Sequence, residues 1–98
     1  MSRSLLERKL DDVVARLRSL REELTIAEEQ LAALADTADE TRLRALVSET
    51  PVAEREHGEA QRHADAMDRH RRDVLAEIAD LERAQDELLD RLMSEIRS

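Results

Sequence analysis

The stretch LVSETPVAE, residues 46–54, contains the only proline of this 98-residue chain. A residue that precedes proline is disfavoured in helical geometry, so a helix that arrives from the N-terminal side is expected to end here. Thr50 is a good N-cap residue, and Pro51 then takes the first helical position, where its missing N–H is harmless. The stretch therefore predicts a turn at 48–51 between two helices.

On both sides of this turn, apolar residues recur in alternating steps of four and three, which is the heptad spacing of a coiled-coil seam. Only Arg71 is charged among the seam positions, although 41% of all residues are charged. The composition alone therefore does not explain the pattern. The seam residues are Leu6, Leu10, Val13, Leu17, Leu20, Leu24, Ala27, Leu31, Leu34, Ala38, Thr41 and Ala45, then Ala53, His57, Ala60, Ala64, Met67, Arg71, Val74, Ile78, Leu81, Gln85, Leu88 and Leu92.

The two halves of the seam match each other when the chain is folded back at residue 49. Seam positions then face each other in pairs whose residue numbers add up to 98, such as Leu20 with Ile78. The pattern predicts an all-α fold: one domain, 1–98, that is a long antiparallel two-helix coiled-coil hairpin. We expect the first helix at about 4–48 and the second at about 51–97.

Three polar features qualify this prediction. The sequence TADE, residues 37–40, resembles a capping box and would allow the first helix to break or kink near 36–38. In the seam itself, His57 opposite Thr41 is expected to form a polar layer that fixes the register. Arg71 opposite Ala27 is expected to extend its charge past the small side chain.

The two flanks of the seam differ in character. If the seam positions are called a and d, the positions that follow d form the e flank, and those that precede a form the g flank. Only Ala84 is apolar on the g flank, whereas the e flank has several apolar residues that a lone hairpin does not need. They predict self-association into a homodimeric four-helix bundle; the alternative is that they only broaden the hairpin's own core. These e residues are Val14, Ala35, Leu75, Leu89 and Ile96.

A second apolar group lies off the seam beside the turn. Leu43, Leu46 and Val47 on the first helix and Val52 on the second are expected to form a surface for a protein partner, unless the helix rolls to bury them locally. Acidic residues surround this group; we interpret them as a solvated surface, and the alternative is that they attract a basic partner. They are Asp36, Asp39, Glu40, Glu49, Glu54 and Glu56.

Composition argues against several classes of function. The formal net charge of −8 and the absence of aromatic residues do not suit nucleic-acid binding. The chain has no cysteine, no glycine-rich phosphate loop and no catalytic triad pattern, and His63 and His70 are too far apart on one helix for a metal site. We therefore expect no enzyme, no metal and no cofactor. With no apolar run of membrane-spanning length, we expect a cytoplasmic protein that does not bind membranes.

These observations favour a non-enzymatic protein–protein interaction module. It would be a small coiled-coil adaptor or regulator, and the sequence does not identify its protein partner. Three alternatives stay open. The first is a transcription regulator whose acidic turn engages a sigma factor or RNA polymerase. The second is a sensor that holds a small ligand between paired hairpins, where Arg21, Arg71 or Arg72 would meet phosphate groups. The third is a structural spacer.

Overall fold

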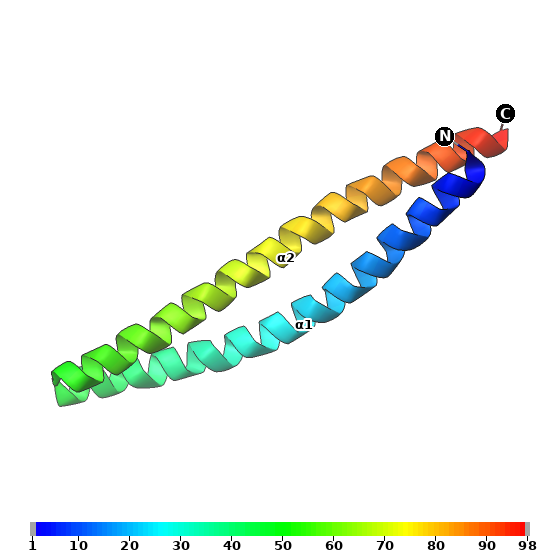
Figure 1. Ribbon diagram of the computed structural model, residues 1–98. Helices are drawn as coiled ribbons and strands as arrows, with labels where there is room; N and C mark the ends of the chain where they lie inside the picture. Colours follow the sequence, from blue (N-terminus) through cyan, green and yellow to red (C-terminus); the bar gives the residue numbers. More distant parts are fainter. Residues whose placement is uncertain (1, 98) are drawn as a thin grey trace. The chain divides into compact units, whose positions relative to one another are not determined.

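The structure is a computed structural model in which residues 2–97 are described. It contains two helices, α1 (Arg3–Ser48) and α2 (Pro51–Arg97), which are joined by a two-residue connection (Figure 1). The helices run antiparallel and pack against each other, so the predicted all-α antiparallel helical hairpin is confirmed. Within residues 2–97, neither helix contains a segment long and apolar enough to cross a membrane.

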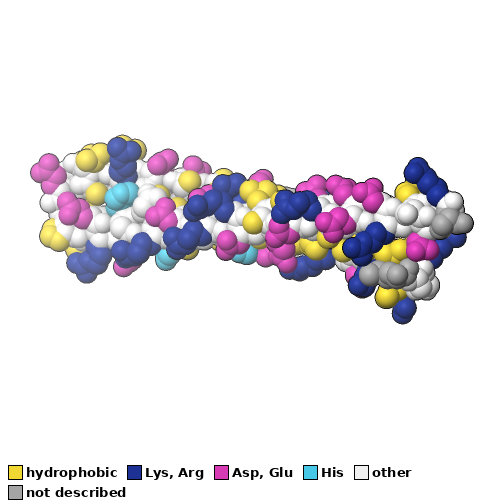
Figure 2. Space-filling model, turned by 90° about the horizontal axis from the view of Figure 1, so that it is seen from above, with side chains coloured by type: hydrophobic (Ala, Val, Ile, Leu, Met, Phe, Trp, Pro, Cys, Tyr) yellow, Lys and Arg dark blue, Asp and Glu magenta, His cyan; other side chains and the backbone are white. Residues whose placement is uncertain are grey.

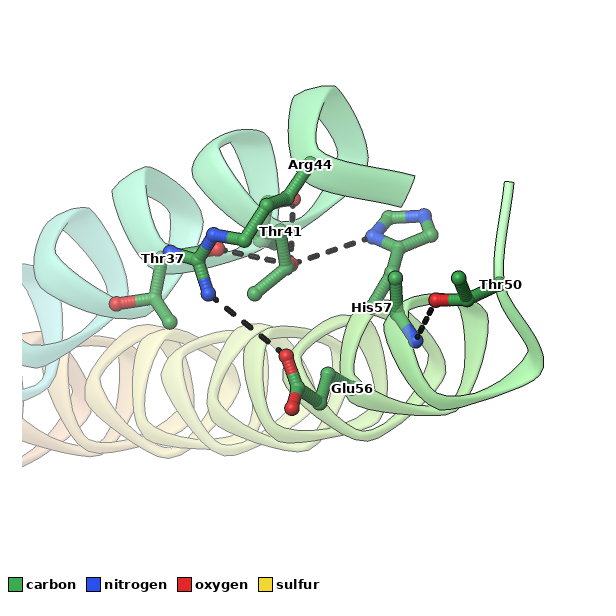
Figure 3. Close-up of polar contacts among 8 residues, drawn as sticks. Thr37, Thr41, Arg44, Thr50, Glu56 and His57 are labelled. Atoms are coloured by element: carbon green, nitrogen blue, oxygen red, sulfur yellow. Dashed lines mark hydrogen bonds and ion pairs between the residues drawn. The ribbon is translucent and has the colours of Figure 1, made fainter. Parts of the chain in front are cut away.

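Side-chain caps mark the starts of both helices. The Ser2 hydroxyl accepts a hydrogen bond from the backbone N–H of Leu5 at 3.2 Å, and the Thr50 hydroxyl accepts one from the N–H of Ala53 at 3.2 Å (Figure 3). Each cap satisfies one of the N–H groups that the first turn of a helix leaves without a partner. Pro51 is the first residue of α2, so the predicted capping of this helix by Thr50 is confirmed.

The end of α1 depends on an unusual backbone conformation. Glu49 has a φ angle of 52°, which lies in the left-handed region. Its N–H still donates to the carbonyl of Ala45 at 3.0 Å, so the helical hydrogen bonding extends to the residue where the chain reverses. A left-handed residue after the last helical position is a common way to end a helix, but glycine usually occupies it.

The hairpin consists of two compact units. The terminal unit comprises Met1–Glu23 and Val74–Ser98, and the turn unit comprises Leu24–Asp73. In each unit, one segment of α1 lies against one segment of α2. Large branched side chains such as Leu17 and Leu20 fill the core of the terminal unit, whereas the buried residues of the turn unit are mostly alanines, such as Ala38 and Ala60.

Burial follows the predicted seam closely. Every seam position is buried or half-buried, and every fully buried residue among the described residues is a seam position. Leu6, Leu17 and Leu20 are the largest side chains with almost no exposed surface. The heptad pattern therefore identified the contact face of both helices.

Ion pairs between the helices show the same antiparallel pairing. On the g flank, Arg16 meets Glu77 at 3.0 Å in the terminal unit, and Arg44 meets Glu56 at 3.7 Å in the turn unit. Antiparallel coiled coils bring like flanks together, so g meets g and e meets e. These pairs are about half exposed, and each is therefore worth at most about 1 kcal/mol.

The helix α1 runs without interruption through the TADE sequence. Thr37 does not cap a new helix there, because its hydroxyl donates a hydrogen bond to the backbone carbonyl of Ala33 at 3.2 Å. This bond to the carbonyl four residues earlier is the usual way for threonine to satisfy its hydroxyl inside a helix.

Candidate protein-binding surfaces

The four apolar residues beside the turn are all exposed. We call Leu43, Leu46, Val47 and Val52 the tip patch; their exposed fractions range from 58% for Val52 to 86% for Val47. The first three lie on the side of α1 opposite the seam, since they follow the seam residue Thr41 at offsets that point away from α2. Figure 2 shows hydrophobic side chains at the surface, among charged ones, at the end of the molecule that carries the turn. The helix therefore does not roll to bury these residues locally.

An acidic turn of helix adjoins the tip patch on the same face of α1. Asp39 precedes Leu43 by four residues and Leu46 by seven, which are the spacings that place side chains in line along a helix. Asp36 and Glu40 lie beside it, and all three carboxylates are exposed. The outer face of α1 therefore changes from acidic to apolar towards the turn.

A hollow lies beside the tip patch, between the two helices of the turn unit. Its lining includes the patch residue Leu46, the charged residues Arg42 and Glu54, and the seam residues Ala45 and His57. A protein side chain that enters it would contact the apolar residues Ala45 and Leu46 and charges of both signs.

His57, which lines this hollow, also belongs to the predicted polar layer (Figure 3). The Thr41 hydroxyl lies 2.9 Å from the carbonyls of Thr37 and Ala38 and 3.4 Å from Nδ1 of His57. The hydroxyl donates its single hydrogen to one of these three acceptors, and the direction of its contact with His57 depends on the tautomer of the imidazole ring. The predicted Thr41–His57 pairing is thus present, and it joins α1 to α2 near the turn.

The apolar e-flank residues form the second candidate surface. Val14, Leu75, Leu89 and Ile96 all belong to the terminal unit, and their exposed fractions range from 38% to 55%. We call these four residues the side patch. Ala35, the remaining predicted member of the self-association surface, is half-buried and belongs to the turn unit, so it is not part of this cluster.

The sequence analysis missed Met93, which is 47% exposed and also belongs to the terminal unit. It lies four residues after Leu89 and three before Ile96, so it continues the side patch along α2. A search for a second heptad register beside the seam would have found it. Ile26 on α1 is a further exposed apolar residue, at 54%, but it belongs to neither patch.

The arginines that were considered for ligand binding are engaged in ion pairs. Arg21 pairs with Glu82 at 3.9 Å, whereas Arg71 and Arg72 pair with the two oxygens of Asp68 at 3.0 Å and 3.2 Å. Arg71 thus keeps its charge at the edge of the seam, where an acidic residue one turn earlier balances it. Within residues 2–97, no group of three or more potential ligand residues could hold a metal ion.

The fold and its surfaces define a class of protein: an antiparallel helical hairpin with exposed hydrophobic residues that suggest a partner surface. In comparisons with family models, with curated proteins and with solved structures, nothing matches this chain.

Proposed function

We propose that this chain is a non-enzymatic protein–protein interaction module, a small adaptor or regulator, and that it binds its partner through the tip patch. The observation that supports this most directly is the exposure of Leu43, Leu46, Val47 and Val52 next to an acidic helical turn. Fully burying one such side chain is worth about 1.5–3 kcal/mol before the costs of association, so a partner that covers the patch would gain binding free energy.

The surrounding charge favours a basic partner. The acidic turn at Asp36, Asp39 and Glu40 would attract positive side chains and hold them beside the apolar contact. A transcription regulator that contacts a sigma factor or RNA polymerase would be one member of this class. A pure spacer would need no tip patch.

We also propose that the chain works as a homodimer in the form of a four-helix bundle, with the side patch as the contact between copies. The residues Val14, Leu75, Leu89 and Ile96 support this, because they lie on one flank of the terminal unit and keep 38–55% of their surface exposed in a single hairpin. Pairing the hairpins would cover this flank.

The test of the tip patch is affinity capture from the native host, followed by a binding measurement with the recovered partner. Leu46→Glu and Val47→Glu should each weaken binding about 10-fold or more, since each places a charge in an apolar contact. Ile26→Glu is the matched control, because it makes the same change at another exposed apolar residue of α1. It should leave binding within about 3-fold of the wild-type value.

Circular dichroism and melting curves would show whether all three variants keep the helical hairpin, which we expect because each site is exposed. If both tip variants bind the partner as tightly as the control, the tip patch is not the docking surface. A spacer function would then explain the protein better.

A further inference from the structure

A second heptad stripe runs along α2 in the terminal unit, beside the seam. It begins at Leu75 and continues in steps of four and three, and it includes Met93, which the e flank alone does not. The stripe is apolar at both ends and acidic in the middle, and apart from the half-buried Ala79 its residues are exposed. Its members are Leu75, Ala79, Glu82, Asp86, Leu89, Met93 and Ile96.

On the same side of the terminal unit, α1 has a complementary pattern. Arg21 pairs with Glu82 at 3.9 Å, so these two e positions lie at the same level along the hairpin. Val14 precedes Arg21 by one heptad and Leu89 follows Glu82 by one heptad, which places Val14 and Leu89 level with each other. The exposed Arg18 lies between Val14 and Arg21, as Asp86 lies between Glu82 and Leu89 on α2. From Val14 to Arg21, α1 is therefore apolar or basic at the levels where α2 is apolar or acidic. Nearer the chain ends, the acidic Asp11 and Glu7 of α1 lie level with Met93 and Ile96.

We infer that a second copy of the chain covers this side, with the two-fold axis parallel to the helices, so that α1 of each copy lies on α2 of the other. A rotation about such an axis keeps every residue at its own level. Val14 then packs on Leu89 of the partner subunit, and Arg18 lies beside Asp86 of the partner subunit. Over the levels from Val14 to Arg21, the surface is thus complementary to itself in its apolar contact and in the sign of its charges.

The opposite arrangement, with the two-fold axis across the helices, lacks this complementarity. It would place α2 on α2, so that the acidic centre of the stripe at Glu82 and Asp86 meets another acidic centre. Like charges brought together at an interface oppose association, which is why the charge pattern selects the first arrangement. This inference rests on the proposed homodimer, and it can fail or succeed independently of the tip patch.

The experiment uses charge reversal and mixing. Arg18→Glu alone places Glu against Asp86 at both contacts of the dimer, and Asp86→Arg alone places Arg against Arg18 at both. Each variant should raise the dimer dissociation constant about 10-fold. When the two variants are mixed in equal amounts, one contact pairs Glu with Arg and the other retains Arg18 with Asp86. The mixture should therefore form dimers within about 3-fold of the wild-type dissociation constant.

The mixing step separates contacts between copies from contacts within one copy. In the part of the chain that the structure describes, Arg18 and Asp86 form no ion pair with each other, so a rescue on mixing would come from the second copy. The matched control makes the same reversals at Arg8 and Asp90, which are exposed but lie outside both stripes. Arg8→Glu and Asp90→Arg should leave dimerisation within about 3-fold, alone or mixed.

Sedimentation velocity over a concentration series gives the dissociation constants. A wild-type chain that is monomeric at about 100 µM would overturn the inference, since a Kd above that range is too weak for the proposed dimer. A wild-type dimer without rescue on mixing would overturn the arrangement. A spin label at Ser94 gives a second readout: the two labels should lie within about 25 Å, because helix axes in a bundle are about 10 Å apart. A much longer distance would favour the arrangement with the axis across the helices.

Discussion

Glu49 ends α1 in the left-handed conformation, a position that glycine usually occupies. Thr50 caps α2 and Pro51 is its first residue, so the chain reverses directly before them. The φ of 52° then falls on Glu49, although a residue with a Cβ is disfavoured in the left-handed region by about 1–2 kcal/mol. The sequence predicted the position of the turn, because proline and threonine restrict local geometry. It did not predict which residue would adopt the left-handed conformation.

A substitution tests this conformation. Glu49→Gly should raise the free energy of unfolding by about 0.5–1 kcal/mol, because glycine removes the left-handed penalty but loses some of that gain through its freedom in the unfolded chain. The measurement is urea denaturation followed by circular dichroism. Glu49→Ala is the control, since it removes the same charge and keeps the Cβ. Equal stability of the two variants would mean that no such penalty exists at this residue.

At the scale of the helices, the two units differ in what their seams bury. In the terminal unit Leu17, Leu20 and Ile78 fill the space between α1 and α2, whereas in the turn unit Ala38 and Ala60 bury little apolar area. Hydrophobic stabilisation grows with buried apolar area, so the terminal unit supplies most of it.

Leu20 offers a direct test of that difference, since its side chain is fully buried. Leu20→Ala should lower the free energy of unfolding by about 2–5 kcal/mol, the range for emptying a packed core position. Leu43→Ala is the matched control, because it removes the same atoms from a residue that is 64% exposed. It should change the stability by no more than about 0.5 kcal/mol. Similar losses for both variants would contradict the assignment of Leu20 to the core, and denaturant melts would show it.

For the whole molecule, the two patches should act independently, because one belongs to the turn unit and the other to the terminal unit. Leu89→Glu should convert the proposed dimer to a monomer, with a dissociation constant raised about 10-fold or more, and leave the affinity of one tip for its partner unchanged. Val47→Glu should do the reverse. Sedimentation velocity and partner titration measure the two effects separately.

A loss of partner binding in the Leu89→Glu variant would show that the tip patch functions only in the dimer. A loss of dimerisation in the Val47→Glu variant would show that the copies also touch at the turn. Either result would contradict the independence of the two patches. It would indicate that both patches belong to one composite binding surface.

The sequence predicted the fold more fully than the surfaces. The seam, the turn and the Thr41–His57 layer follow from spacing, because a heptad repeat specifies its own partner face when the chain folds back on itself. Met93 was missed because each flank was considered as a single row of positions, whereas an exposed stripe on a helix is two rows wide. The identity of the partner depends on the surface of another molecule, and no pattern within one chain contains that information.

The pairing of seam positions about Glu49 has a consequence for how the chain can change in length. A deletion of one residue from α1 between Leu20 and the turn would shift every layer from that site to the chain ends, so that Leu20 would no longer meet Ile78. Matched insertions of one whole heptad in both helices, at equal distances from the turn, would instead lengthen the hairpin and keep all layers aligned. Natural variants of this protein should therefore differ in length by matched seven-residue insertions or deletions in both helices. Single-residue insertions should be confined to the ends of the chain.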